Sequence, residues 1–409
     1  LYLNTTGVDN TAIGNQTLRF NTIGKQNTAV GAAALFTNTT GDFNTAFGYT
    51  SLYANTIGVE NTAIGRTSLR NNTIGSFNIA VGRASLYTNV IGSNNTAVGT
   101  NALFYNTTNN NSAFGYNALY SNTIGVENTA IGRSSLRNNT TGGYNTAIGR
   151  GSLYTNIVGS ANVAVGVNAL FYAVGNNNTA VGTNALFNNT ANSNSAFGYT
   201  SLFANTTGAS NSAFGMQALR YNTIGNSNSA FGVYSLYYNT TGSNNTAVGR
   251  QTLYSNTTGV NNSAIGAYAL SQNTIGSANT AVGYQSGNSN TTGERNSYFG
   301  YQVCNVGNAS DTVGIGWRSL YSNTANYIVA VGRSALESNK TGASNVAVGY
   351  QALVLNTSGS SNVAMGTQAL YTNLIGNNNT AIGHLALYAN TTNNNSAFGY
   401  KALFANTPG

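Results

Sequence analysis

The sequence predicts an all-β fold, a parallel β-solenoid (β-roll) of about 24 coils with 16 or 17 residues each. One 17-residue unit, shown by residues 27–43 (NTAVGAAALFTNTTGDF), repeats along the chain. We number its columns 1 to 17 from Asn27. Seventeen spacings between copies are 17 residues and six are 16 residues. The copies begin at residues 10, 27, 44, 61, 78, 95, 111, 128, 145, 162, 178, 194, 211, 228, 245, 262, 279, 296, 312, 328, 345, 362, 379 and 395.

The pattern within a copy favours strands and turns over helices. Column 5 is Gly in all 24 copies, and apolar columns do not recur at spacings of three and four. We therefore expect one repeat per coil with two short strands, over columns 2–6 and 8–11, for example 28–32 and 34–37. The Asn-rich columns 12–17 are expected to form turns. The 16-residue copies lose their residue between columns 10 and 17, which supports this division.

Strand alternation places columns 2 and 4 on one face and columns 3 and 5 on the other. We expect the Val, Ile or Phe of column 4 to fill the coil interior together with column 9, which is Leu in 22 copies. Asn in columns 1 and 12 is expected to stack along the axis and to bond turn backbone. Column 3, Ala in 22 copies, would then form a flat outward strip. This strip predicts a chain–chain interface and a homo-oligomer or filament of identical chains, with Ala29, Ala46, Ala63 and Ala97 as candidate contacts.

The repeat predicts a single continuous solenoid rod over residues 1–409, with irregular copies at about 284–316. The chain opens in column 9 and stops in column 15, so we expect a segment of a longer protein. The formal charge of +8, without a dense basic cluster, argues against nucleic-acid binding. No stretch approaches about 18 consecutive apolar residues, so no membrane insertion is expected within this segment.

Column 10 carries a candidate surface-binding or stacking ladder of aromatic residues. One interpretation is a sugar-stacking stripe for surface glycans, and the preferred one is a structural ring stack with Arg in cation–π contact. Two arginine groups, one repeated 67 residues after the other, are candidate anion patches, although solvated or stacked arginines are the simpler interpretation. The ladder candidates are Phe36, Tyr53, Tyr87, Phe104, Tyr120, Tyr154, Tyr237 and Tyr254. The anion-patch candidates are Arg66, Arg70, Arg83, Arg133, Arg137 and Arg150.

No catalytic residue, cofactor site or metal site is predicted. His384 is the only histidine, the seven acidic residues are scattered, and a calcium-binding roll would need aspartates in its turns. Cys304 stands in a Leu column and is interpreted as a buried small hydrophobe. Triplets such as Asn38-Thr39-Thr40 match the N-glycosylation pattern, but a turn that favours Asn and Thr explains them more simply. An ice-binding Thr array is a further, less favoured alternative because column 2 varies.

The tandem unit Asn-[Thr/Ser]-Ala-[Val/Ile/Phe]-Gly, as in residues 61–65 and with Val in its second position in residues 345–349, resembles the YadA-like head repeats of trimeric autotransporter adhesins. It also resembles repeat arrays of tail-fibre-type proteins with a C-terminal intramolecular chaperone. The resemblance implies a left-handed roll, three chains about one axis, and display outside the cell. The unit here is longer, with a second half such as Leu52–Gly58.

From the residues and this resemblance together we expect a non-catalytic extracellular fibre or rod segment of an oligomeric surface adhesin or tail-fibre-like appendage, at a cell or virion surface. A trimer is the favoured homo-oligomer. Such a segment gives reach and multivalent surface attachment, because weak identical contacts along it add up. The alternative is a self-assembling structural filament without an adhesive role.

Overall fold

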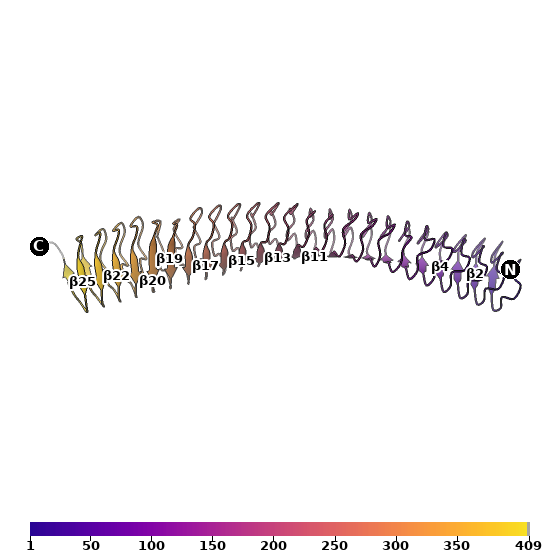
Figure 1. The fold of residues 1–409 in the computed structure, drawn as a ribbon, viewed down its shortest axis with the longest axis horizontal. Coiled ribbons are helices and arrows are strands. Elements are labelled where there is room, and N and C mark those ends of the chain that lie inside the picture. The colour runs from indigo at the N-terminus through magenta and orange to yellow at the C-terminus, as the bar shows by residue number, and fades with distance from the viewer. Residues whose placement is uncertain (407–409) are drawn as a thin grey trace. The chain divides into compact units, whose positions relative to one another are not determined.

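The computed structural model describes residues 1–406; residues 407–409, the end of the expected array, lie outside the described part. The described residues form two compact units, Leu1–Thr207 and residues 208–406. Each unit is a stack of coils with one repeat per coil, and its strands pair in parallel with the strands of neighbouring coils. In Figure 1 the strand arrows follow one side of each stack and the turns follow the other. The prediction of an all-β parallel β-solenoid is confirmed.

The strands cover columns 2–4 and pair in register, so that Ala29 lies between Ala12 and Ala46 of the adjacent coils. In the first unit they are β1 (Thr11–Ile13), β2 (Thr28–Val30), β3 (Thr45–Phe47), β4 (Thr62–Ile64), β5 (Ile79–Val81), β6 (Thr96–Val98), β7 (Ser112–Phe114), β8 (Thr129–Ile131), β9 (Thr146–Ile148), β10 (Val163–Val165), β11 (Thr179–Val181) and β12 (Ser195–Phe197).

The second unit continues the same pattern, except that β19 and β20 begin one column earlier, and it adds one short pair near its end. Its strands are β13 (Ser212–Phe214), β14 (Ser229–Phe231), β15 (Thr246–Val248), β16 (Ser263–Ile265), β17 (Thr280–Val282), β18 (Ser297–Phe299), β19 (Thr312–Ile315), β20 (Ile328–Val331), β21 (Val346–Val348), β22 (Val363–Met365), β23 (Thr380–Ile382), β24 (Ala389–Asn390), β25 (Ser396–Phe398) and β26 (Ala405–Asn406).

The expected second strand over columns 8–11 is wrong for nearly every coil. Among residues 1–406, only the two-residue pair β24 and β26 includes a residue of these columns. The backbone takes positive φ in columns 7 and 9, for example 53° at Ala33 and 51° at Leu35, which interrupts an extended conformation. Coil-to-coil hydrogen bonds nevertheless continue there: Leu35 N–H donates to Ser51 O at 3.0 Å. Stacking of the coils is therefore maintained without a second sheet that runs along the stack.

The assignment of the strand faces is also corrected by the structure. Ala29, Ala46, Ala63 and Ala97 are 0% exposed, so the predicted chain–chain interface of column 3 is wrong. Column 4 points outward instead, with Phe47 and Ile64 each 43% exposed. The reason is the width of the coil. Leu of column 9, which was correctly expected inside, fills the interior and leaves room for only a methyl group opposite.

Two ladders of buried asparagine link the coils, as expected for columns 1 and 12. Asn38 Nδ2 donates to Asn21 Oδ1 of the preceding coil at 2.8 Å and to Gly41 O of its own coil at 2.9 Å. Asn27 Nδ2 also donates to Gly41 O, at 2.8 Å, and Asn27 N–H donates to Asn10 Oδ1 at 3.0 Å. The two ladders therefore meet at one turn carbonyl in each coil, and they satisfy polar groups that burial would otherwise leave unpaired.

Glycine is required where neighbouring coils come closest. In column 5 Gly31 has φ of 128°, a conformation that side chains disfavour. In column 15 a Cβ on Gly24 would lie 2.6 Å from the carbonyl oxygen of Gly41 in the next coil. These two positions set how tightly the backbone can stack.

Candidate functional site

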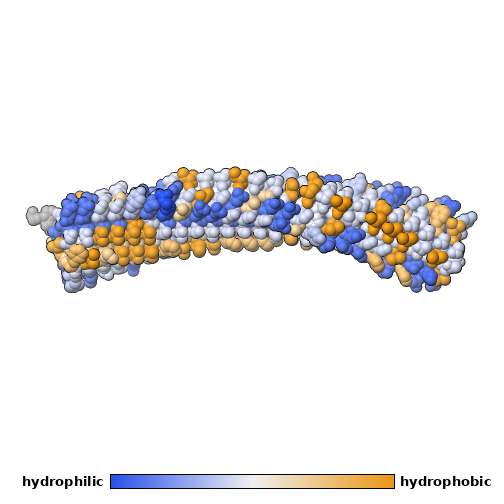
Figure 2. Space-filling view, in the orientation of Figure 1, coloured by the Kyte–Doolittle hydropathy of each residue, from blue (hydrophilic) through white to orange (hydrophobic). Residues whose placement is uncertain are grey.

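The outward side chains of columns 2 and 4 form a continuous surface in each unit, which we call the sheet face. Within columns 2 to 4 no charged residue occurs in any copy. Its column 4 members include Phe114 at 39%, Ile131 at 40% and Ile265 at 47% exposure. Figure 2 shows this face over the second unit as an orange band along the strands. The sheet face is an exposed apolar strip built by repetition, a feature that usually marks an interaction surface.

The candidate ladder of column 10 is a stack of rings. Phe36 lies against Tyr53 with ring centroids 4.9 Å apart and planes 3° apart. Tyr87 stacks on Phe104 at 5.0 Å, and Phe104 on Tyr120 at 5.3 Å. The remaining candidates also stack: Tyr154 on Phe171 at 4.9 Å, and Tyr237 on Tyr254 at 5.2 Å. The structure therefore brings all eight candidates into stacks.

Arginine takes the place of a ring in several coils. The Arg70 guanidinium carbon lies 5.4 Å from the Tyr53 centroid and 5.8 Å from the Tyr87 centroid. Arg137 is placed between Tyr120 and Tyr154 in the same way, 5.7 Å from each centroid, and donates to Tyr154 Oη at 2.9 Å. Arg70 and Arg137 are thus members of the ladder, in cation–π contact on both sides.

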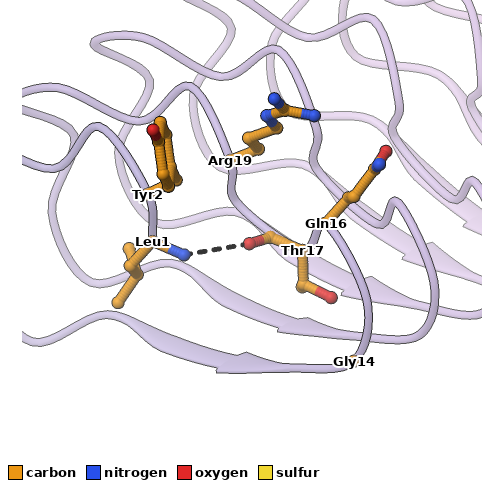
Figure 3. A pocket seen from close by; sticks show the side chains of 6 residues that line it. All are labelled: Leu1, Tyr2, Gly14, Gln16, Thr17 and Arg19. Carbon is orange, nitrogen blue, oxygen red and sulfur yellow. Dashed lines mark hydrogen bonds between the residues drawn. The ribbon is translucent and has the colours of Figure 1, made fainter.

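Figure 3 shows the ladder at close range, in a hollow at the first coil. Arg19 lies beside Tyr2, 5.7 Å from its ring centroid, and Gln16 and Thr17 border the same space. The amino group of Leu1 donates to Thr17 O at 3.1 Å, drawn as a dashed line. Thr17 Oγ1 donates to Gly31 O of the next coil at 2.8 Å, so this hydroxyl takes part in coil stacking.

Stacking limits what the ladder can bind. Sugar rings stack on the face of an aromatic ring, but both faces of Tyr53, Tyr87, Phe104 and Tyr120 are covered by the rungs above and below. Only the ring edges reach the solvent. An uninterrupted ladder is therefore suited to stiffening a stack of coils and unsuited to capturing glycans.

The other arginine candidates lie in column 6, in pairs from adjacent coils. Arg66 and Arg83 form one pair, and Arg133 and Arg150 form the other; all four are exposed. Arg133 and Arg150 line a hollow of about 300 Å³, where Gly151 lacks a side chain. Each predicted group of three therefore separates into one stacked arginine and one exposed pair. Two guanidinium groups in adjacent coils suit a small anion.

In the irregular copies, a large side chain and small side chains have exchanged places in the core. Tyr298 replaces Ala in column 3 and is 0% exposed. Its ring occupies space that smaller residues leave: a Cβ on Gly287, in a Leu column, would lie 2.9 Å from Tyr298 Cδ2. Cys304 also replaces Leu and is fully buried, as the sequence indicated. Tyr298 Oη shares a hydrogen bond of 2.9 Å with Thr312 Oγ1. The core of this region is therefore repacked around Tyr298.

Two coils interrupt the column 12 ladder, and each interruption leaves a buried amide oxygen unpaired. Ala173 and Gly307 stand where the other copies have Asn. In the preceding coils, Asn156 Oδ1 and Asn290 Oδ1 are buried without a hydrogen-bond partner. Every coil therefore depends on the amide of the next one.

Replacing Ala173 with Asn is expected to stabilise its unit by about 1 kcal/mol, because the new amide would donate to Asn156 Oδ1. Asn106 and Asn189 already occupy column 12 of other 16-residue copies, so the shortened turn accepts Asn. Hydrogen exchange of the flanking coils measures the gain. Ala173→Ser is a control that adds a hydroxyl too short to complete the ladder. Faster exchange in Ala173→Asn than in the parent chain would contradict the prediction.

Buried asparagine also bears on the glycosylation pattern. Asn38 of the Asn-Thr-Thr triplet is 0% exposed and its amide makes two donor bonds. Such an amide is inaccessible in the folded coil, which favours the simpler interpretation of these triplets as turn residues.

Within residues 1–406 we find no group of three or more His, Cys, Asp or Glu side chains arranged to hold a metal ion. The described residues also contain no helix that could cross a bilayer. His384 lies edge-on to Tyr400, with ring centroids 5.5 Å apart.

Sequence reasoning missed one site. In the second unit the ladder stops after Tyr254, because column 10 of the next three copies is Ser271, Asn288 and Asn305. A groove of about 590 Å³ lies over this gap. We call it the Ser271 groove. The missing rings were visible in the sequence as the signal for it.

Comparisons with known proteins add no family assignment. No protein-family model matches the chain, and no curated protein matches it.

Proposed function

We propose that this chain is a non-catalytic segment of an extracellular fibre, in which identical chains associate through their sheet faces. The fibre would give reach and multivalent attachment at a cell or virion surface, as in an oligomeric adhesin or a tail-fibre-like appendage. A trimer is the favoured oligomeric state, because the Asn-Thr-Ala-Val-Gly units resemble the head repeats of trimeric adhesins. The single observation that supports association is the exposed, uncharged sheet face with its apolar column 4 side chains.

A second copy of this chain fits the sheet face better than an unrelated partner. The side chains of column 4 are spaced by the strand separation of about 4.8 Å, and another copy carries rows with the same spacing. The face holds no charged residue, so two copies meet without repulsion between like charges. Each coil adds one weak contact, and many such contacts in series give tight association.

Lysine on the sheet face is expected to separate the chains. The variant Phe47→Lys/Phe114→Lys/Ile131→Lys places three charges among apolar side chains that would be buried in the assembly. Sedimentation equilibrium should find a multimer for the parent chain and monomer for the variant, with unchanged circular dichroism.

The matched control carries the same kind of change on the turn side of the coils: Ile57→Lys/Ile74→Lys/Ile124→Lys. These residues are 49–62% exposed and should leave the multimer intact. A parent chain that stays monomeric at all concentrations would refute the assembly proposal. Equal loss of assembly in both variants would show that assembly does not depend specifically on the sheet face.

The same surface would also serve the alternative, a structural filament without an adhesive role. Electron microscopy of the native fibre separates the two: unbroken coils across chain ends favour the filament, and discrete projections favour the appendage. We do not extend the proposal to ice binding, because column 4 varies among Val, Ile, Phe and Met, which makes the exposed face uneven.

A further inference from the structure

We infer that the Ser271 groove is a binding site for a neutral oligosaccharide. It would supply the contact that the proposed attachment function requires, and in that respect it rests on that function. Its lining includes Gln251, Tyr254, Tyr268, Ser271, Gln285 and Asn288.

The groove exists because the ladder is interrupted. Tyr254 stacks on Tyr237 through one face, with planes 8° apart. Its other face is directed along column 10 toward Ser271, a position where most other coils have an aromatic ring or an arginine. The free face of the Tyr254 ring therefore closes one end of the groove. In the intact ladder, the next rung covers the corresponding face. A sugar ring placed there would occupy the position of the missing rung.

The rest of the lining suits hydroxyl groups. Column 7 contributes Gln251, Tyr268 and Gln285 to the lining, and column 10 contributes Ser271 and Asn288. Gln285 Oε1 accepts a hydrogen bond from Gln302 Nε2 at 2.8 Å, which holds its amide in place. Amides and hydroxyls both donate and accept, as sugar hydroxyls do. None of the lining side chains carries a charge, which favours neutral over anionic sugars.

Size and enclosure agree with this ligand class. The volume of about 590 Å³ lies within the range of roughly 300–1,000 Å³ that small-ligand sites occupy. The lining comes from three successive coils, at columns 7, 10, 11 and 13. A short oligosaccharide along the stack would therefore contact several coils through equivalent columns.

Filling the gap tests the site without damaging the coil. Ser271→Tyr restores the ring that column 10 carries in most copies, so it should fold well while occupying the sugar position. Val354→Tyr is the matched control, because it adds the same ring to column 10 in a coil outside the groove. The probe is an array of neutral oligosaccharides built from glucose, N-acetylglucosamine, galactose and mannose, followed by calorimetric titration of any ligand bound.

We expect the parent chain to bind at least one neutral class, Ser271→Tyr to weaken that binding by more than about tenfold, and Val354→Tyr to leave it unchanged. Absence of binding to all neutral sugars would overturn the inference. So would binding that Ser271→Tyr does not affect, or binding confined to sulfated or sialylated sugars. Sedimentation of Ser271→Tyr should match the parent chain, so failure of the groove and failure of the sheet-face assembly can be distinguished.

Discussion

Replacing Tyr298 with Ala is expected to destabilise its unit by about 3–5 kcal/mol, the range for deleting a large aromatic side chain from a core. The ring is fully buried. Neighbouring positions carry smaller residues than in other copies: Gly287 and Cys304 replace Leu in column 9, and Gly314 replaces Ala in column 3. Alanine would restore the common residue of column 3 while the partners that normally fill the coil are missing. The result is a cavity where a regular coil would have none.

Cys304 reports this change directly. The thiol is buried, and burial raises its pKa to about 11, so it should react very slowly with iodoacetamide in the parent chain. In Tyr298→Ala we expect alkylation to accelerate with the local opening rate. Tyr301→Ala is the control, since this nearby tyrosine is 45% exposed. Equal, slow alkylation in all three proteins would contradict the predicted cavity.

A second substitution should rescue the first. Gly287→Leu alone is expected to destabilise, because its Cβ would lie 2.9 Å from the Tyr298 ring. Combined with Tyr298→Ala it returns a Leu to column 9, where φ of 62° at Gly287 matches the positive φ of the other leucines. The double variant should exceed both single variants in stability. Additive losses would show that the two residues do not share one space.

Replacing Asn139 with Ala is expected to lower the free energy of unfolding of its unit by about 2–3 kcal/mol. Asn139 Nδ2 donates to Asn122 Oδ1 and to Gly142 O, each at 2.8 Å, and Asn139 Oδ1 accepts from Asn156 Nδ2 at 2.8 Å. Removal leaves Asn122 Oδ1 buried without a donor, as Ala173 does for Asn156 Oδ1. Gly142 O keeps a bond from Asn128 Nδ2, which limits the loss.

Asn139→Asp separates hydrogen bonding from packing, because it keeps the shape but replaces donors with acceptors and buries a charge. We expect it to be worse than Asn139→Ala. Asn138→Ala, at the partly exposed neighbouring position, is the control. Native-state hydrogen exchange is the suitable measurement, since a stack of repeats can open locally. Protection of the flanking coils that does not change in Asn139→Ala would refute the ladder's energetic role.

The repeat itself was enough to predict the solenoid, the inward Leu of column 9 and the asparagine ladders. Alternation also separated column 3 from columns 2 and 4, but it does not state which side faces inward. Hydrophobicity alone favoured the bulky residues of column 4 as the interior side chains. The interior of the coil is too narrow for them, because Leu of column 9 fills it and leaves room only for Ala of column 3. A signal for this was present, because column 3 changes to Tyr298 just where column 9 changes to Gly287 and Cys304.

The second strand was mispredicted for a different reason. Leu at positive φ, as at Leu35 with 51°, contradicts the ordinary preference of this residue. Only the surrounding stack can impose it, through burial of the side chain and coil-to-coil hydrogen bonds. For the Ser271 groove the sequence shows the missing rings of column 10, but the groove itself also needs the neighbouring residues of columns 7, 11 and 13, which only the structure brings together.

The asparagine ladders also give each stack a direction. Along the uninterrupted runs of both columns, Nδ2 donates toward the preceding coil, as Asn38 does to Asn21 and Asn61 does to Asn44. The amide dipoles are therefore aligned head to tail, and they polarise one another in the same sense. A coil surface that presents amide donors can be continued only by a surface that presents amide oxygens. Growth of such a stack by another coil is therefore polar: one coil surface accepts only the opposite surface of the next.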